Sequence, residues 1–378
     1  MLKAVRGLMA LAVGIGAFTS NAHATENFPG SSLGGVFVMS NDASKNAVLA
    51  YKRLSDGRLA FQDSFVTGGR GSGGTADPLQ SQGSLTLSGD HTLLFAINAG
   101  SGTISSFRIV GGLPILVDQQ PTGGAEPVAA AEQNGVLYVL NAGGNGAIVA
   151  FHTDGSGRLQ EISNSLTYLT ATASGASSIS ISPDGKALAV IEKAPDNIDI
   201  FPIRADGTLG TVVINHSVTP GAFSALFAPS GKLIVSENQP SDGNNASSIS
   251  SYTVNANGTI TAISQSLPTD GNGNCWNAIT PNGKYVYAEN SATATVAGFS
   301  VATDGVLTPI NATVVATDST GATNLDVASS ADGKYLYTLD SGLGAVSVYL
   351  INADGSLTDF GEIDGFPKAV GFNGIAAI

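Results

Sequence analysis

The chain has 378 residues, and 48 of them are glycine, against a usual share of ~7%. Asp and Glu number 29 and Lys and Arg 16, so the formal net charge is −13. A hydrophobic content of 43% with only 12% charged residues excludes an intrinsically disordered chain. No cluster of Lys and Arg exists, so we expect neither a nucleic-acid partner nor binding to an anionic membrane. Abundant small, turn-forming and β-branched residues indicate an all-β protein.

Residues 1–24 have the three parts of a signal peptide. Lys3 and Arg6 form a basic start, residues 8–18 are apolar, and Ala22-His23-Ala24 is a small-x-small cleavage motif. The apolar stretch is too short to span a bilayer, and no later segment reaches the ~18 apolar residues that a membrane helix needs. We therefore expect cleavage after Ala24, a mature chain without membrane insertion, and a secreted or periplasmic location. Residues 25–33 are expected to be a short linker.

From residue 34 onward, a turn followed by an apolar strand recurs along the chain. The strands end near residues 41, 98, 141, 192, 238, 290 and 340, and several follow Asp-Gly or Asn-Gly turns, as in SPDGKALAVIE and TPNGKYVYAEN. A period of about 50 residues with four strand-like segments fits one blade of a β-propeller. The repeats therefore predict seven four-stranded blades in a single domain, residues 34–378, which we expect to be a monomer.

The two ends of the repeat array predict how the ring closes. The first copy, from Gly34, lacks an inner strand, and the chain ends with an extra one, GFNGIAAI, at 371–378. We therefore expect the C-terminal strand to pair into the N-terminal blade, which removes the open edges of the ring.

The repeats resemble the lactonase-type seven-bladed propellers, a family that includes propeller 6-phosphogluconolactonases and carboxy-muconate cyclases. The resemblance covers 34–378 and is carried by SPDGKALAV, TPNGKYVYAEN, SADGKYLYTLD and the terminal FNGIAAI. It implies a lactone hydrolase or a cyclase that acts on a small organic acid or sugar lactone at the channel mouth. The family's inner-strand His is matched here by other residues, namely Ser84, Ser178, Ser224, Trp276 and Asp326.

Because the family's His is missing, the sequence also allows a function of another class, without catalysis. In this alternative the chain is a non-catalytic exported scaffold that binds a small molecule, a cation or a protein partner. The sequence alone does not decide between the enzyme and the scaffold. Convergence of a carboxylate and a cation at one point of the channel mouth would favour the enzyme.

Loops at the channel mouth carry the candidate catalytic groups. For acyl chemistry, Glu192 or Asp326 is the candidate base, and Arg70, Lys193 or a bound cation is the candidate electrophile. The long loop 67–82 carries Arg70 and Asp77; it is either a surface loop or a lid that brings Arg70 over the channel.

Other side chains at the mouth are candidates for ligand and metal binding. Trp276 is a candidate apolar wall, and the candidate polar contacts are Asn277, Asn324, Asn238 and Asn290. The candidate metal ligands are Asn141, Glu192 and Asp340, with calcium as the candidate ion; alternatively, such side chains cap turns. We expect Cys275, the single cysteine, to be buried and unpaired.

Overall fold

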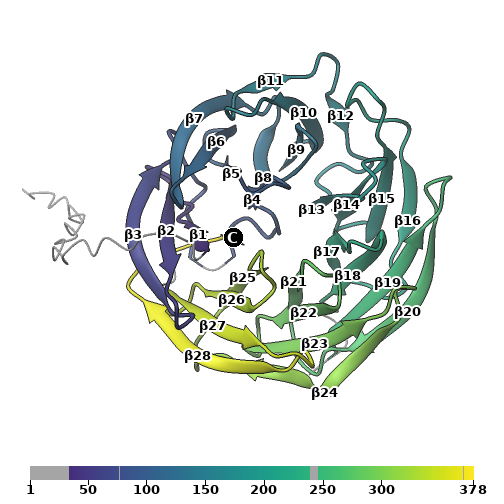
Figure 1. Ribbon diagram of the computed structural model, residues 1–378. Coiled ribbons are helices and arrows are strands. Elements are labelled where there is room, and N and C mark those ends of the chain that lie inside the picture. The colour runs from purple at the N-terminus through teal and green to yellow at the C-terminus, as the bar shows by residue number, and fades with distance from the viewer. Residues whose placement is uncertain (1–33, 76, 239–245, 369) are drawn as a thin grey trace, which may run out of the picture. The chain divides into compact units, whose positions relative to one another are not determined.

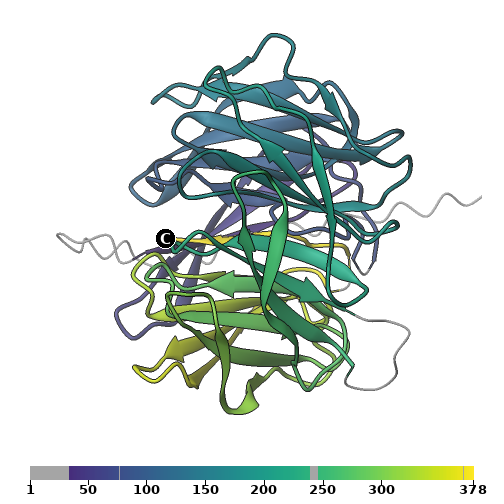
Figure 2. The ribbon, with the colours of Figure 1, turned by 90° about the vertical axis from the view of Figure 1, so that its right-hand side faces the viewer.

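The computed structural model describes residues 34–75, 77–238, 246–368 and 370–378. The expected signal peptide and linker lie outside the described residues. Within the described ranges the secondary structure is β, and no helix there is long and apolar enough to cross a membrane. Seven antiparallel sheets surround a common centre as the blades of a propeller (Figure 1). Figure 2 shows the same ring from the side, with loops at both of its faces.

Blades one to three hold the first part of the chain and the C-terminal strand. In order from the centre outward, their strands are β29 (Ile375–Ala377), β1 (Gly35–Met39), β2 (Ala47–Arg53) and β3 (Leu59–Val66); β4 (Leu85–Leu87), β5 (Leu93–Asn98), β6 (Thr103–Val110) and β7 (Leu113–Pro121); and β8 (Ala125–Gln133), β9 (Val136–Gly143), β10 (Ala147–Thr153) and β11 (Leu159–Glu161), with β12 (Thr167–Tyr168) also paired to β10.

Blades four to seven follow the same plan without additions. Their strands are β13 (Ala176–Ile181), β14 (Ala187–Glu192), β15 (Asn197–Pro202) and β16 (Val213–His216); β17 (Ala222–Phe227), β18 (Lys232–Glu237), β19 (Ser248–Val254) and β20 (Ile260–Pro268); β21 (Asn274–Ile279), β22 (Tyr285–Asn290), β23 (Thr295–Val301) and β24 (Leu307–Thr317); and β25 (Asn324–Ser329), β26 (Tyr335–Asp340), β27 (Ala345–Ile351) and β28 (Leu357–Asp364).

The core lies between the blades. The second strand of each blade is almost wholly buried, as in β5 and β14, because neighbouring blades cover both of its faces. These strands therefore read as continuous apolar runs, whereas the outer strand β3 is exposed at most of its positions. Because of this packing, the repeats can be recognised in the sequence by their apolar second strands.

The ring closes as expected. Strand β29 pairs antiparallel with β1, Val36 opposite Ala377 and Val38 opposite Ile375. Just before β29, Phe372 packs against Phe366 with ring centroids 4.5 Å apart. The closing strand is therefore anchored by backbone pairing and by buried apolar contacts.

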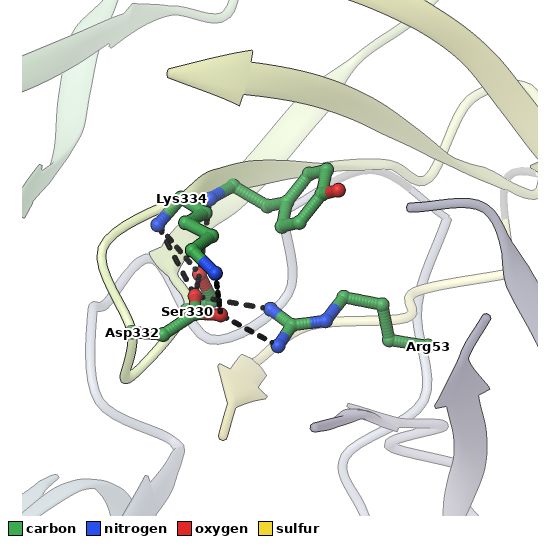
Figure 3. Close-up of polar contacts among 5 residues, drawn as sticks. Arg53, Ser330, Asp332 and Lys334 are labelled. Atoms are coloured by element: carbon green, nitrogen blue, oxygen red, sulfur yellow. Dashed lines mark hydrogen bonds and ion pairs between the residues drawn. The ribbon is translucent and has the colours of Figure 1, made fainter. Parts of the chain in front are cut away.

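A polar contact also joins the first blade to the last (Figure 3). Arg53, at the end of β2, donates two hydrogen bonds to the two carboxylate oxygens of Asp332, at 3.1 and 2.8 Å. The Arg53 guanidinium also lies 5.0 Å from the ring centre of Tyr335. Its side chain is only 8% exposed, whereas that of Asp332 is 33% exposed, so this two-pronged ion pair is partly shielded from solvent and strengthens the seam.

Candidate active site at the channel mouth

Each blade presents the end of its second strand and the start of its inner strand on the same side of the ring. The strand register places Ala176 opposite Glu192, Asn274 opposite Asn290, and Asn324 opposite Asp340. We call this side the mouth face. Most inner strands are irregular near this end, where a bulge shifts the register. The bulges place successive side chains at the channel mouth.

A ring of Asn, Glu and Asp side chains ends the second strands on the mouth face. Five of these side chains accept a hydrogen bond from a Thr or Ser that follows the outer strand of the preceding blade: Thr67 to Asn98 (2.6 Å), Thr122 to Asn141 (2.6 Å), Thr170 to Glu192 (2.5 Å), Ser217 to Glu237 (2.5 Å) and Thr269 to Asn290 (2.8 Å). In the fifth blade the ring position is Glu237, opposite Ala222, one residue before the Asn238 that the repeat pattern indicated. The ring therefore joins consecutive blades.

The three candidate metal ligands do not converge in this structure. Asn141, Glu192 and Asp340 belong to the third, fourth and seventh blades. Each is already bonded to protein groups; Asp340, for instance, accepts from Ser347 at 2.5 Å. In the part of the chain that the structure describes, no three His, Cys, Asp or Glu side chains are placed to hold a metal ion.

Residues 77–82, which we call the plug segment, cross the centre of the ring at the mouth face. They form the last part of the loop between the first and second blades. The hydroxyl of Ser81 donates to the Val128 carbonyl of the third blade (2.8 Å), and the Gln82 N–H donates to the Ser177 carbonyl of the fourth (2.8 Å). The Ser81 carbonyl accepts from the Trp276 indole of the sixth blade (2.9 Å).

The side chain of Gln82 contacts β21 of the sixth blade again and adds β25 of the seventh blade. Its side-chain amide donates to the Asn277 carbonyl at 2.8 Å and to the Asp326 carboxylate at 3.3 Å. Gln82 is 7% exposed. The plug segment therefore lies against inner strands of several blades at once, and it delivers side chains from the loop to the centre of the mouth.

The glycine-rich start of the same loop is pinned to the first two blades. A Cβ on Gly71 would lie 2.2 Å from the backbone carbonyl oxygen of Asn41, so only glycine fits there. Arg70 is exposed, and its guanidinium donates to the Gly100 carbonyl of the second blade at 3.5 Å. Arg70, which the lid interpretation expected over the channel, thus lies on the second blade, and residues 77–82 of the same loop contact the inner strands instead.

Asp77 and Lys193 meet at the plug segment. Asp77 Oδ1 accepts from the Gln80 N–H at 2.9 Å and from the Asn373 side-chain amide at 3.1 Å. Lys193 Nζ donates to the Gln80 carbonyl at 2.8 Å and lies 4.8 Å from the centre of the Phe223 ring. The negatively charged Asp77 and the positively charged Lys193 therefore both bond to the backbone of Gln80. Both side chains are half-buried.

Burial changes the proton affinities of this pair. It raises the pKa of Asp77 to about 6, although the Gln80 N–H and the Lys193 ammonium oppose the change. Burial also lowers the pKa of Lys193 from its ordinary value. A carboxylate that titrates near neutrality beside an ammonium group is the combination that general-base catalysis uses.

Aromatic and sulfur groups support the plug segment. Trp276 is 1% exposed and packs edge-to-face on Phe223 with centroids 5.1 Å apart. In this structure its indole holds the plug segment instead of facing solvent. Cys275 is buried and free, and burial raises the pKa of its thiol to about 12, which agrees with an inert thiol. The side-chain amide of Asn238 lies 3.9 Å from its sulfur.

The two carboxylates expected to act as bases have other partners. Asp326 accepts from the N–H groups of Val327 (2.9 Å) and Ile375 (3.2 Å), and burial raises its pKa to about 7. Glu192 accepts from the N–H groups of Thr170 and Ala171. Burial, together with the neighbouring Glu192, raises the pKa of Asp199 to about 8. Asp326 and Glu192 are therefore both occupied by hydrogen bonds from backbone N–H groups.

The remaining candidate contacts are also buried in the described structure. Asn277 donates to Ser224 (2.9 Å) and Ser236 (3.0 Å), Asn290 donates to the Thr269 carbonyl (3.2 Å), and Asn324 donates to Asp318. Asn238 is half-buried, and its side-chain oxygen has no hydrogen-bond partner among the described residues. The side-chain oxygens of Asn277 and Asn324 likewise have no hydrogen-bond partner among the described residues, and all three of these oxygens are buried.

A buried acidic cluster lies behind the mouth, between the sixth and seventh blades. Both carboxyl oxygens of Glu289 lack a hydrogen-bond donor among the described residues, and so does the side-chain oxygen of Asn324 beside it. Burial, followed by the nearby Asp318, Asp340 and Asp326, raises the pKa of Glu289 well above its ordinary value. A proton on Glu289 removes a buried charge and supplies a donor to a cluster rich in acceptors.

Replacing Glu289 by Gln should therefore make the fold less sensitive to alkali. A carboxyl group whose pKa is higher in the folded state than in the unfolded state contributes its full stabilisation below the unfolded pKa of ~4.3. This stabilisation is lost as the pH rises through the folded pKa. Glu289→Gln keeps a neutral side chain at every pH. Relative to wild type, its free energy of unfolding should increase by up to about 1.4 kcal/mol per pH unit in that window, measured by urea unfolding between pH 5 and 9. Glu161→Gln, at an exposed position of β11 in the third blade, is the control, and equal pH slopes in wild type and Glu289→Gln would contradict the buried proton.

Sequence reasoning missed the central role of Asp77, Gln80 and Gln82. They lie in a loop without periodicity, and their partners come from the first, fourth, sixth and seventh blades. The available signal was the Asp-Pro step at Asp77 and Pro78, which ends the glycine-rich stretch and favours an ordered turn.

Comparisons with known proteins agree with this architecture. The sequence matches the family described as Lactonase, 7-bladed beta-propeller, over residues 35–243 and 243–367. A search of the curated proteins finds no sequence match.

Three solved structures illustrate the structural similarity. The periplasmic gluconolactonase PpgL of Pseudomonas aeruginosa has 15% identity and a TM-score of 0.63, with 90% of this chain and 99% of that chain covered. A Bacteroides uniformis protein with a provisional assignment as a 6-phosphogluconolactonase has 18% identity and a TM-score of 0.66, with 92% and 99% covered. Kuenenia stuttgartiensis hydrazine synthase has 18% identity and a TM-score of 0.59, with 89% and 99% covered. At these identities the likeness concerns the fold alone, since unrelated activities share it. The family match extends over nearly the whole propeller, and the chain belongs to the lactonase family of seven-bladed β-propellers.

Proposed function

We propose that the protein is an exported lactone hydrolase whose reaction takes place at the plug segment. The observation that carries this proposal is the placement of Asp77 and Lys193 on the same residue, Gln80, at the channel mouth. Membership of the lactonase family supports it. The export rests on the leader-like residues 1–24, and the periplasmic location of the similar gluconolactonase is consistent with it.

The chemistry follows from the positions of the two groups. Among the described residues, the hydrogen bonds to Asp77 use Oδ1, which leaves Oδ2 to accept a proton from water. The hydroxide that forms adds to the lactone carbonyl carbon, and the Lys193 ammonium donates a hydrogen bond to the carbonyl oxygen as it becomes negative. When the tetrahedral intermediate collapses, the ring C–O bond breaks and the proton on Asp77 passes to the ring oxygen. One lactone and one water give one hydroxy acid.

A lactone panel tests this function directly. Purified mature protein should open aldonolactones with an initial rate above the buffer-catalysed rate. The rate is measured as the release of acid at constant pH. EDTA should not change the rate, because this mechanism uses no metal. Lys193→Met should lower kcat by about 10²-fold through loss of the carbonyl donor. Lys186→Met, at an exposed lysine that pairs with Asp184, is the matched control. No hydrolysis of any lactone would support the scaffold alternative.

A further inference from the structure

We infer that Asn373, on the C-terminal segment that closes the ring, is a positioning residue for Asp77; this inference rests on the proposed function. Asn373 is fully buried and lies two residues before β29. Its backbone N–H donates to the Met39 carbonyl of β1 at 3.2 Å, so the first blade fixes its position. Its side-chain amide donates to Asp77 Oδ1 at 3.1 Å. The segment that closes the ring therefore also supplies a hydrogen bond to the proposed base.

Ser84 sets the orientation of the Asn373 amide. Ser84 is buried just before β4 in the second blade, and its hydroxyl donates to Asn373 Oδ1 at 2.9 Å. This contact leaves the NH2 group facing Asp77, whereas a reversed amide would set an acceptor against the carboxylate. The approach depends on Gly374, which has φ +92° and where a Cβ would lie 2.5 Å from Ser84 Oγ. The second blade, the closing segment and the plug segment thus meet at one amide.

The closing segment supports the plug segment at a second point. The Ile375 N–H donates to Asp326 Oδ2 at 3.2 Å, and Asp326 Oδ1 accepts from the side-chain amide of Gln82 at 3.3 Å. Asp77 begins the plug segment and Gln82 ends it. Asn373 and Ile375, two residues apart, therefore hold both ends of the plug segment, the first directly and the second through Asp326.

The Asn373 amide favours the ionised form of Asp77, which is the form that can act as a base. Burial raises the pKa of Asp77 to about 6, and the hydrogen bond from Asn373 is one of the contacts that oppose this change. The titratable groups that interact with Asp77 are Lys193, Asp326 and Cys275. Unlike these groups, Asn373 keeps the same charge at every pH. It therefore stabilises the ionised base without competing with Lys193 for the lactone carbonyl.

The test is the pH profile of kcat for glucono-δ-lactone in two variants. Asn373→Asp keeps the size of the side chain and its contact with the Ser84 hydroxyl, but it replaces the donor by a carboxyl group. Two carboxylates about 3 Å apart do not readily ionise together, so the inflection near pH 6 should move up by about one pH unit or more, with little change in KM. Ser84→Ala frees the amide to turn away from Asp77 and should move the inflection up by a few tenths of a unit.

A control variant and the wild type separate this inference from the proposed function. Asn352→Asp makes the same change in a hairpin of the seventh blade, where the amide donates to the hydroxyls of Ser356 and Thr358 at 3.0 Å each, and its inflection should stay near pH 6. Active Asn373→Asp and Ser84→Ala enzymes with unmoved inflections would overturn the inference and leave the lactonase function standing. If Asn373→Asp does not fold, the inflection of Ser84→Ala decides by the same criterion. A wild-type protein that opens no lactone would overturn both.

Discussion

Deletion of residues 371–378 should abolish soluble folded protein. The segment contains Phe372 and Ile375, both 4% exposed, and burial of each contributes about 1.5–3 kcal/mol. Its removal also exposes the edge of β1 and takes away Asn373, which holds Asp77 at 3.1 Å. The combined loss is comparable to the whole stability of a typical domain, ~5–15 kcal/mol. Soluble yield and thermal melting measure the effect, and a truncated chain that melts like the full one would contradict ring closure by β29.

A milder change tests the same seam in protein that still folds. Arg53→Met removes the two-pronged ion pair with Asp332 (2.8 Å) while β29 stays in place. We expect a loss of about 1–3 kcal/mol, less than for a fully buried pair because Asp332 keeps a third of its surface exposed. Arg58→Met is the control, since Arg58 pairs with Asp56 in open solvent, where water and salt screen the attraction and such contacts add little stability. Equal unfolding midpoints for the two variants would show that the Arg53 contact does not stabilise the seam.

Asp77→Asn should lower kcat for lactone hydrolysis by about 10²- to 10⁴-fold with little change in KM. Asparagine has the same size and retains an oxygen that can accept from the Gln80 N–H, so the plug segment should stay in place. It has no carboxylate to take the proton from water. Asp304→Asn is the matched control, because Asp304 accepts a similar hydrogen bond from the Val306 N–H (3.1 Å) in a distant turn. An Asp77→Asn enzyme with near wild-type kcat would remove Asp77 from the mechanism.

The propeller was predictable because its signals are local and repeated. Asp-Gly and Asn-Gly turns fix hairpins within a few residues, and the buried second strands, such as β14, show as apolar runs. The extra terminal strand was also visible, because the first repeat lacked an inner partner for β1. These features depend on neighbours along the chain or on a count of repeats.

The candidate site was less predictable because it depends on contacts between distant segments. Gln82 reaches Asn277 and Asp326, which lie 195 and 244 residues away, and nothing in its local sequence marks this role. The repeat pattern also placed the fifth ring position at Asn238, whereas Glu237 lies opposite Ala222. The hairpin turn before β18 is one residue shorter than its counterpart in the sixth blade: the Ala228 N–H donates to the Lys232 carbonyl, but the Thr280 N–H donates to the Tyr285 carbonyl. Trp276 was recognised as special, but its indole supports the plug segment by donating to Ser81 at 2.9 Å.

The most direct test of the account is the pH dependence of the catalysed rate. The rate of glucono-δ-lactone opening, corrected for the buffer reaction, should rise with a single ionisation near pH 6, because burial raises the pKa of Asp77 to about 6 and only its ionised form can accept a proton. At alkaline pH the rate should fall as Lys193, whose pKa burial lowers, loses its charge. The residual activity of Asp77→Asn should lack the inflection near pH 6. The same inflection in Asp77→Asn, or a wild-type rate that does not change between about pH 5 and 7, would contradict catalysis by Asp77 at the plug segment.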